Sequence, residues 1–253
     1  MSDPDTPPGK RAPLRAVQLL PNLLTLGALC AGLSAIRFAV HGNLTLAVAL
    51  IALAALLDGL DGAMARLLKS ESAMGAELDS LADFLNFGVA PALMLYLWAL
   101  PDSRSGGWIA ALIYAICCAL RLARYNVGDK AAAGKKSAWF QGVPAPGAAL
   151  LALLPLVMFQ VMPGVVTPIL PFFTGLWLVI VGLLMIARNP TPSFKLLRIS
   201  RDKAPFFMVA LMGIAATAFT WPWPVLLVAQ IAYLFILARF ALKPPQLIAK
   251  DND

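Results

Sequence analysis

Charged residues are scarce in this chain of 253 residues, and histidine and cysteine are scarcer still. Only 13% of the residues are charged, about half the fraction expected of a soluble domain. The one histidine, His41, falls in a short polar turn far from any acidic cluster, which argues against a serine–histidine–aspartate triad. The three cysteines lie inside apolar runs, which argues against disulfides or a cysteine-bound metal. No basic segment is interleaved with aromatic residues, so we expect no nucleic-acid partner.

Long apolar runs take the place of the missing charge, since 60% of the residues are hydrophobic. They lie at about 20–40, 43–66, 75–100, 107–127, 146–162, 168–188, 205–221 and 223–240. Most are near the roughly 20 residues that a helix needs to cross a bilayer, and an open sheet could not satisfy its backbone there. The sequence therefore predicts an all-α fold, a polytopic transmembrane helical bundle of about eight spans. The run at 146–162 is short, and Pro155 interrupts it.

The basic residues predict the orientation of this bundle. With eight spans both termini share a side, and all of the 20 basic residues except Arg37 and Arg104 then lie on it. By the positive-inside rule both termini are cytoplasmic, and the net charge of +7 suits anionic membrane lipids. We expect a multi-pass protein of a cell membrane of the bacterial inner-membrane type, with the polar tails 1–13 and 243–253 in the cytoplasm. The first tail is expected to be disordered.

Four of the 13 acidic residues lie where apolar runs meet. The stretch Asp58-Gly-Leu-Asp61-Gly62-Ala-Met-Ala65-Arg66 is followed, after eight residues, by Gly75-Ala-Glu-Leu-Asp79-Ser-Leu-Ala-Asp83. One aspartate at mid-membrane depth costs about 2.5–3.5 kcal/mol, and four would cost roughly 10 kcal/mol. These side chains must therefore face a polar cavity or a cation.

The spacing of the four aspartates supports the same conclusion. At about 100° per residue, Asp58 and Asp61 share one helix face, and Asp79 and Asp83 form a stripe on the next helix. A short polar link between the two helices predicts an antiparallel pair in which the carboxylates converge. Converging oxygen ligands suit a hard cation such as Mg²⁺ or Mn²⁺, which can also bind phosphate oxygens.

The pattern Asp-x-x-Asp-Gly-x-x-Ala-Arg, eight residues, then Gly-x-x-x-Asp-x-x-x-Asp resembles the signature of the CDP-alcohol phosphatidyltransferases, and every fixed position is met. The resemblance makes 14–242 the family's transmembrane domain. It implies transfer of the phosphatidyl group of CDP-diacylglycerol to an alcohol, with release of CMP, and it implies a homodimer. The implied metal ligands are Asp58, Asp61, Asp79 and Asp83, with Asp83 also the catalytic base. The implied CDP-diacylglycerol site comprises Gly62, Ala65, Arg66 and Gly75, and Asn22 and Thr25 of the first span are expected to face the same cavity.

Further stretches resemble the phosphatidylserine synthase branch of that family. They are Pro21-Asn22-Leu-Leu-Thr25, the segment 84–91, Arg121-Leu-Ala-Arg124-Tyr125-Asn126, Phe140-Gln-Gly142-Val-Pro144-Ala-Pro146 and the segment 188–195. The branch implies L-serine as the acceptor. We expect its carboxylate to be bound by cations from the set Arg121, Arg124, Lys135 and Lys195.

Plainer interpretations of these residues stand beside the functional ones. Proline at a helix start is ordinary, arginines at a cytoplasmic helix end give the positive-inside signal, and loop lysines are usually solvated. Glycerol 3-phosphate or inositol phosphate would need the same cations as serine. A cation or proton transporter also carries buried aspartates, but it would spread them through the membrane, whereas these lie at one side. The last two runs carry no motif.

Overall fold

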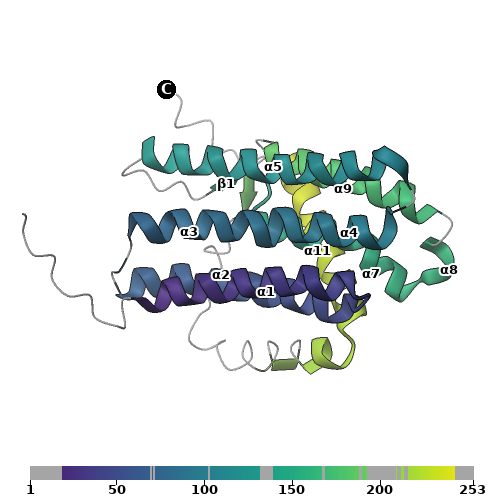
Figure 1. Ribbon diagram of the computed structural model, residues 1–253, viewed down its shortest axis with the longest axis horizontal. Coiled ribbons are helices and arrows are strands. Elements are labelled where there is room, and N and C mark those ends of the chain that lie inside the picture. Colours follow the sequence, from purple (N-terminus) through teal and green to yellow (C-terminus); the bar gives the residue numbers. More distant parts are fainter. Residues whose placement is uncertain are drawn as a thin grey trace, which may run out of the picture.

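The computed structural model describes residues 19–68, 70, 72–101, 103–131, 139–166, 169–187, 190–192, 209, 212–213 and 216–242. Both predicted tails lie outside the described residues, as do Lys135, Lys195 and eight of the 17 residues of the apolar run at 205–221. Figure 1 shows a helical bundle in which several long helices run side by side along the longest axis.

Helices make up nearly all of the described chain. Their bounds are α1 (Leu20–Val40), α2 (Leu44–Leu68), α3 (Ala73–Asp83), the π-helical segment η2 (Phe84–Val89), α4 (Ala90–Ala99), α5 (Arg104–Ala131), α6 (Ala145–Ala152), α7 (Leu154–Val161), α8 (Pro163–Val166), α9 (Leu170–Ile186) and α11 (Pro222–Leu242). Two strands of three residues, β1 (Trp139–Gln141) and β2 (Pro190–Pro192), form one antiparallel pair. The predicted all-helical class is confirmed, with this short pair as an addition.

Within the described residues, five helices are long and apolar enough to cross a membrane. They are Leu20–Val40, Leu44–Leu68, the continuous stretch Ala73–Ala99, Ser105–Val127 and Pro222–Phe240. Two further apolar helices are shorter, Ala145–Val161 and Leu170–Ile186. The bounds agree with the apolar runs to within a few residues. A multi-pass membrane protein is therefore confirmed, while the prediction of eight spans with cytoplasmic termini stays a prediction.

Helices α1 and α2 form a hairpin and pack extensively against each other. Helix α2 carries Asp58 and Asp61. A turn at His41 and Gly42 joins the two helices, and Gly42 adopts a φ of 77°, which favours glycine. His41 accordingly serves as a turn residue, and its Nδ1 lies 2.7 Å from the Arg37 carbonyl oxygen. Alanines and glycines fill much of the contact face of α1, which lets the two backbones approach closely.

A proline explains why a side chain from α5 bonds to the backbone of η2. Pro91 has no N–H, so the carbonyl of Phe87, four residues earlier, has no α-helical donor. The buried Tyr114 hydroxyl donates to this carbonyl at 2.8 Å. Gly88, the residue after Phe87, packs on Cys118 of α5. A Cβ added to Gly88 would lie 3.1 Å from Cys118 Sγ. Gly88 is therefore a point of close packing between η2 and α5.

A second proline, Pro155, also leaves a helix carbonyl without its backbone donor, and a side chain from another helix again supplies the hydrogen bond. The apolar run at 146–162 divides into α6 and α7 just before Pro155. Pro155 cannot donate to the carbonyl of Leu151, and the indole N–H of Trp177 in α9 donates there instead, at 2.7 Å. Gln230 of α11 donates to the neighbouring Leu150 carbonyl, also at 2.7 Å.

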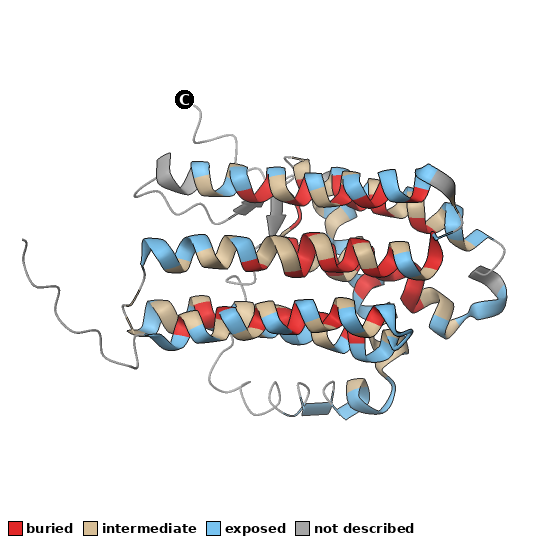
Figure 2. Ribbon diagram, viewed as in Figure 1, coloured by how far each residue is buried: buried red, intermediate tan, exposed pale blue. Residues whose placement is uncertain are grey.

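The buried core does not extend evenly along the bundle. Figure 2 shows the buried residues concentrated in α4, the middle of α5, and α6 and α7, whereas the end where α2 stops and α3 starts is mostly exposed or intermediate. In the same views α11 crosses behind the other helices at a steep angle (Figure 1). The four aspartates thus lie toward the less tightly packed end.

Candidate metal and anion site

Three of the predicted ligands come together in space. One carboxylate oxygen each from Asp58, Asp61 and Asp79 lies within 4.8 Å of the others. Asp61 is buried, with 4% of its surface exposed, and the other two are half-buried. The predicted convergence of carboxylates from the two helices is confirmed for these three residues.

Local signals explain how the chain positions them. The α2 helix ends at Leu68, and α3 begins at Ala73 after the Ser72 side chain accepts the N–H of Gly75 at 3.0 Å. Figure 1 shows α2 and α3 running in opposite directions. The two make few direct contacts, because α1 packs against both. Helices α2 and α3 are therefore antiparallel, as expected. They are held together by α1, which packs on both, and they meet at their carboxylates.

Asp83 lies outside the group of three but next to it. Its carboxyl group is in hydrogen-bonding contact with that of Asp58 and interacts electrostatically with Asp79. Its Oδ1 atom is buried and has no hydrogen-bond partner within the described chain. A buried polar atom without a partner is costly, which fits an oxygen that is available to a ligand.

The first helix supplies the other wall of the site. The Thr25 hydroxyl lies 2.6 Å from Asp61 Oδ2 and 3.1 Å from the Pro21 carbonyl. Asn22 stands over Gly75, where an added Cβ would lie 3.0 Å from Asn22 Oδ1. The structure thus places Thr25 against Asp61 and Asn22 against Gly75, whereas their predicted role in a substrate cavity stays a prediction.

The remaining predicted nucleotide residues follow the aspartates along α2. Gly62 and Ala65 are half-buried, and Arg66 is exposed. An added Cβ on Gly62 would lie 3.6 Å from Arg66 Nη1, so the guanidinium folds back along the helix over this glycine. A cationic group therefore lies beside a surface of low side-chain volume.

The two arginines of α5 differ in their surroundings. Arg121 is buried, interacts electrostatically with Asp83, and leaves its Nε without a partner in the described chain. Arg124 Nη1 donates to the Ile186 carbonyl at 2.8 Å and thereby caps the C-terminal end of α9, while its Nη2 is buried and unpaired there. Both therefore keep donors for an anion, although Arg124 also has a structural bond that the sequence did not predict.

Asn126 lies in a stretch that resembles the phosphatidylserine synthase branch, but the sequence assigned a role neither to it nor to Tyr233. Asn126 Nδ2 donates to Ser80 Oγ at 3.0 Å and links the end of α5 to α3 between Asp79 and Asp83. Tyr233 of α11 lies near Arg121. These contacts join segments distant in the sequence, so no local spacing could have revealed them.

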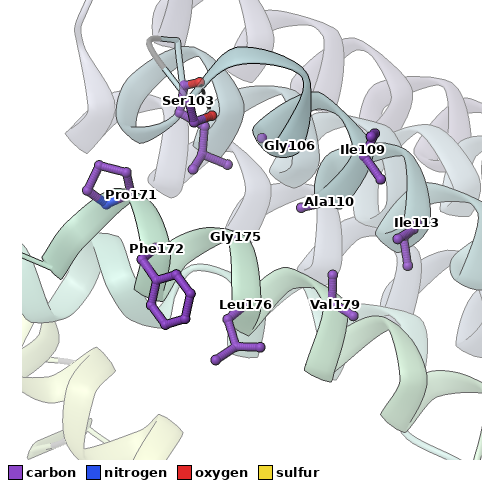
Figure 3. A pocket seen from close by; sticks show the side chains of 12 residues that line it. Ser103, Gly106, Ile109, Ala110, Ile113, Pro171, Phe172, Gly175, Leu176 and Val179 are labelled. Carbon is purple, nitrogen blue, oxygen red and sulfur yellow. Dashed lines mark hydrogen bonds between the residues drawn. The ribbon is translucent and has the colours of Figure 1, made fainter.

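A second cleft, of about 480 Å³, lies between α5 and α9 near the start of both helices. Figure 3 shows side chains of both helices lining it. The lining residues are Leu100, Ser103, Gly106, Gly107, Ile109, Ala110, Ile113, Pro171, Phe172, Gly175, Leu176 and Val179. Its one hydroxyl, Ser103, already bonds to the Leu100 carbonyl at 2.6 Å. The described residues that line the cleft are apolar apart from Ser103, and none of them offers a carboxylate or a cation for phosphoryl transfer.

The electrostatics of the aspartate site fit a bound cation. The three carboxylates lie within 4.8 Å of one another. At such a distance each of the three carboxylate pairs repels by about 3 kcal/mol in a partly buried setting. All available ligand atoms are oxygens, which suit Mg²⁺ or Mn²⁺ rather than a thiolate-seeking metal. Because Arg121 also interacts electrostatically with Asp83, the arrangement can hold a divalent cation and an anionic group near each other.

Comparisons with known proteins agree with this arrangement. Residues 18–187 match the family model described as CDP-alcohol phosphatidyltransferase. The chain is 38% identical over 241 residues to the CDP-diacylglycerol–serine O-phosphatidyltransferase of Mycobacterium bovis, covering 94% of this chain and 82% of the relative. It is 33% identical over 186 residues to the Helicobacter pylori protein of the same name, covering 72% and 76%. An archaetidylserine synthase of Methanothermobacter thermautotrophicus is 37% identical over 133 residues, covering 52% and 54%. With the signature aspartates gathered at one site, the chain belongs to the CDP-alcohol phosphatidyltransferase family.

Proposed function

We propose that this protein transfers the phosphatidyl group of CDP-diacylglycerol to L-serine, which forms phosphatidylserine and releases CMP. The observation that carries the proposal is the cluster of three carboxylates, from Asp58, Asp61 and Asp79, in a chain of this family. The choice of serine rests on the named activity of relatives at 38% identity over most of the chain.

Each part of the site has a proposed task. Asp58, Asp61, Asp79 and Asp83 would hold Mg²⁺ or Mn²⁺, which when bound supplies charge that stabilises the pyrophosphate and the departing CMP. Gly62, Ala65, Arg66 and Gly75 line the nucleotide, with Asn22 and Thr25 on the opposite wall. The small residues allow the substrate to approach the backbone, and Arg66 contributes a positive charge.

Asp83 is proposed to act as the general base. Its buried, unpartnered Oδ1 would accept the proton of the serine hydroxyl. The serine oxygen then forms a bond to the β-phosphorus of CDP-diacylglycerol, and the bond from that phosphorus to the CMP oxygen breaks. Contact with Asp58 holds the Asp83 carboxyl in place.

The acceptor is proposed to bind through its carboxylate. Arg121 keeps a buried Nε and Arg124 a buried Nη2 for this purpose, and a guanidinium binds a carboxylate through two parallel hydrogen bonds. Lys135 and Lys195 are proposed to contribute further positive charge to acceptor binding. The membrane arrangement is also a proposal: eight spans in a bacterial inner membrane, cytoplasmic termini and site, and a homodimer.

The proposal is tested with purified protein in detergent micelles containing CDP-diacylglycerol and Mn²⁺ or Mg²⁺. We expect CMP release that depends on serine, is lost with EDTA and returns with added metal. Glycerol 3-phosphate, inositol phosphate and water serve as the other acceptors. Release with one of the phosphorylated acceptors alone would refute serine while retaining the reaction class, and no release with any acceptor would refute both.

Asp79→Asn tests the metal site within the same assay. We expect serine-dependent release to fall by at least about 100-fold, because a ligand matters more than the outer partners whose loss costs 10–100-fold. The matched control is Glu77→Gln, the same chemical change at an exposed position of α3, which should retain wild-type turnover. Full activity in Asp79→Asn would refute the proposed role of Asp79 as a metal ligand.

A further inference from the structure

Helix α11 is the one long helix of the described chain to which neither the signature nor the matched family segment assigns a role, since that segment ends at residue 187. It is nonetheless fixed to the bundle by specific contacts. Gln230 is buried, with 4% of its surface exposed, and donates to the Leu150 carbonyl of α6 at 2.7 Å. One turn later along the same face stands Tyr233. The docking of α11 therefore determines where Tyr233 lies.

Tyr233 is held over the start of α6 by the absence of a side chain. A Cβ added to Gly147 would lie 2.8 Å from the Tyr233 hydroxyl oxygen and 3.2 Å from its ring. Such contacts are too short for a real Cβ, so the phenol occupies the space that glycine leaves. Gly147 directly follows the stretch ending at Pro146, whose first residues pair with β2, and α11 also contacts β2. The phenol thus packs on the first turn of α6, directly after the segment 140–146.

The same phenol lies near the site. Tyr233 is within electrostatic range of Arg121, which in turn interacts with Asp83. Arg121 is buried and its Nε has no partner in the described chain. A carboxylate bound at this guanidinium would come within electrostatic range of both Asp83 and Tyr233.

We infer that Tyr233 is a residue of the acceptor-binding subsite, where its hydroxyl donates a hydrogen bond to the anionic group of the acceptor held by Arg121. The inference rests on the proposed function. It adds a residue of α11, the last helix, to the acceptor-binding subsite. A hydrogen bond to a charged group contributes roughly 1.5–3 kcal/mol, and each 1.4 kcal/mol is about tenfold in affinity.

The test compares steady-state constants of the wild type with those of Tyr233→Phe. We expect the KM for serine to rise about 10-fold or more, while the KM for CDP-diacylglycerol stays within twofold, because only the acceptor touches the phenol. Tyr96→Phe is the matched control, since Tyr96 packs edge-to-face on Trp108 with ring centroids 5.2 Å apart, away from the arginines. This control should leave both constants unchanged.

A second variant approaches the same hydroxyl from the opposite side. Gly147→Ala keeps the phenol but displaces it, so we expect the same selective rise in the serine KM. An unchanged serine KM in Tyr233→Phe would overturn the inference, as would an equal rise in both constants, which would indicate general distortion. If the wild type uses a different acceptor, the serine assignment fails, and the same ratio measured with that acceptor decides the role of Tyr233. A wild type without any transfer refutes the proposed function and this inference together.

Discussion

The hydroxyl of Thr25 provides the sharpest test of how the aspartate site is organised. It lies 2.6 Å from Asp61 Oδ2, and both residues are buried, with 5% and 4% of their surfaces exposed. Thr25 reaches Asp61 from a different helix, so it orients the carboxylate without being a metal ligand in the proposed site. Thr25→Val removes the hydroxyl and keeps the branched shape of the side chain, which limits the change to the contacts of the hydroxyl with Asp61 and with the Pro21 carbonyl.

The expected magnitude follows from two independent estimates. Loss of a hydrogen bond to a charged group costs roughly 1.5–3 kcal/mol. Loss of an outer partner of a metal ligand typically weakens metal affinity or activity by 10–100-fold, which corresponds to about 1.4–2.7 kcal/mol. Because the two ranges agree, we expect Thr25→Val to raise the Mn²⁺ concentration for half-maximal activity by about 10–100-fold, with partial recovery of turnover at saturating metal.

The assay is a Mn²⁺ titration of CMP release, repeated as direct Mn²⁺ binding by electron paramagnetic resonance. Thr25→Ser should retain most of the affinity because it keeps the hydroxyl. Thr174→Val is the matched control: Thr174 is fully buried in α9, and its Oγ1 has no partner in the described part of the chain. This control should not shift the titration. An unchanged Mn²⁺ dependence in Thr25→Val would refute the idea that Thr25 orients Asp61.

Two further substitutions test the packing behind the site, both by thermal unfolding in detergent. Tyr114→Phe leaves the Phe87 carbonyl of η2 without its donor and should lower the free energy of unfolding by about 1–3 kcal/mol, whereas Tyr96→Phe should change it little. Gly32→Ala places a Cβ onto the buried side chain of Asn86 and should cost about 1–3 kcal/mol; Gly106→Ala, with nothing within 4 Å of the added Cβ, should not destabilise. Equal stability of either variant and its control would contradict the packing described above.

The sequence predicted the parts of the site that depend on spacing within one helix. Asp58 and Asp61, three residues apart, share a helix face, and so do Gly75 and Asp79, four residues apart. The cost of aspartate in lipid then requires these faces to meet, and the structure confirms that Asp58, Asp61 and Asp79 do. The link from residue 69 to residue 72 was short enough to predict the reversal of direction.

What depends on contacts between distant segments could not be predicted in this way. The bond from Arg124 to the Ile186 carbonyl joins residues 62 positions apart, and no periodicity within α5 distinguishes a structural arginine from one that binds an anion. The pairing of β1 with β2 brings together two loops that the sequence treated separately. Gly142 illustrates the point: its φ of 79° and the Met185 carbonyl, 2.6 Å from an added Cβ, give this glycine a structural reason.

The contacts of α5 show how a proline in one helix helps to place an arginine opposite an aspartate. Pro91 frees the Phe87 carbonyl, and Tyr114 bonds to it. Arg121 lies seven residues after Tyr114, which is almost two full helical turns, so both point from the same face of α5. Asp83 lies one turn before Phe87 on the facing helix, and the two helices run in opposite directions (Figure 1). The bond that satisfies the carbonyl therefore also sets the register at which Arg121 meets Asp83. A break in the register at Tyr114 should thus impair catalysis as well as folding.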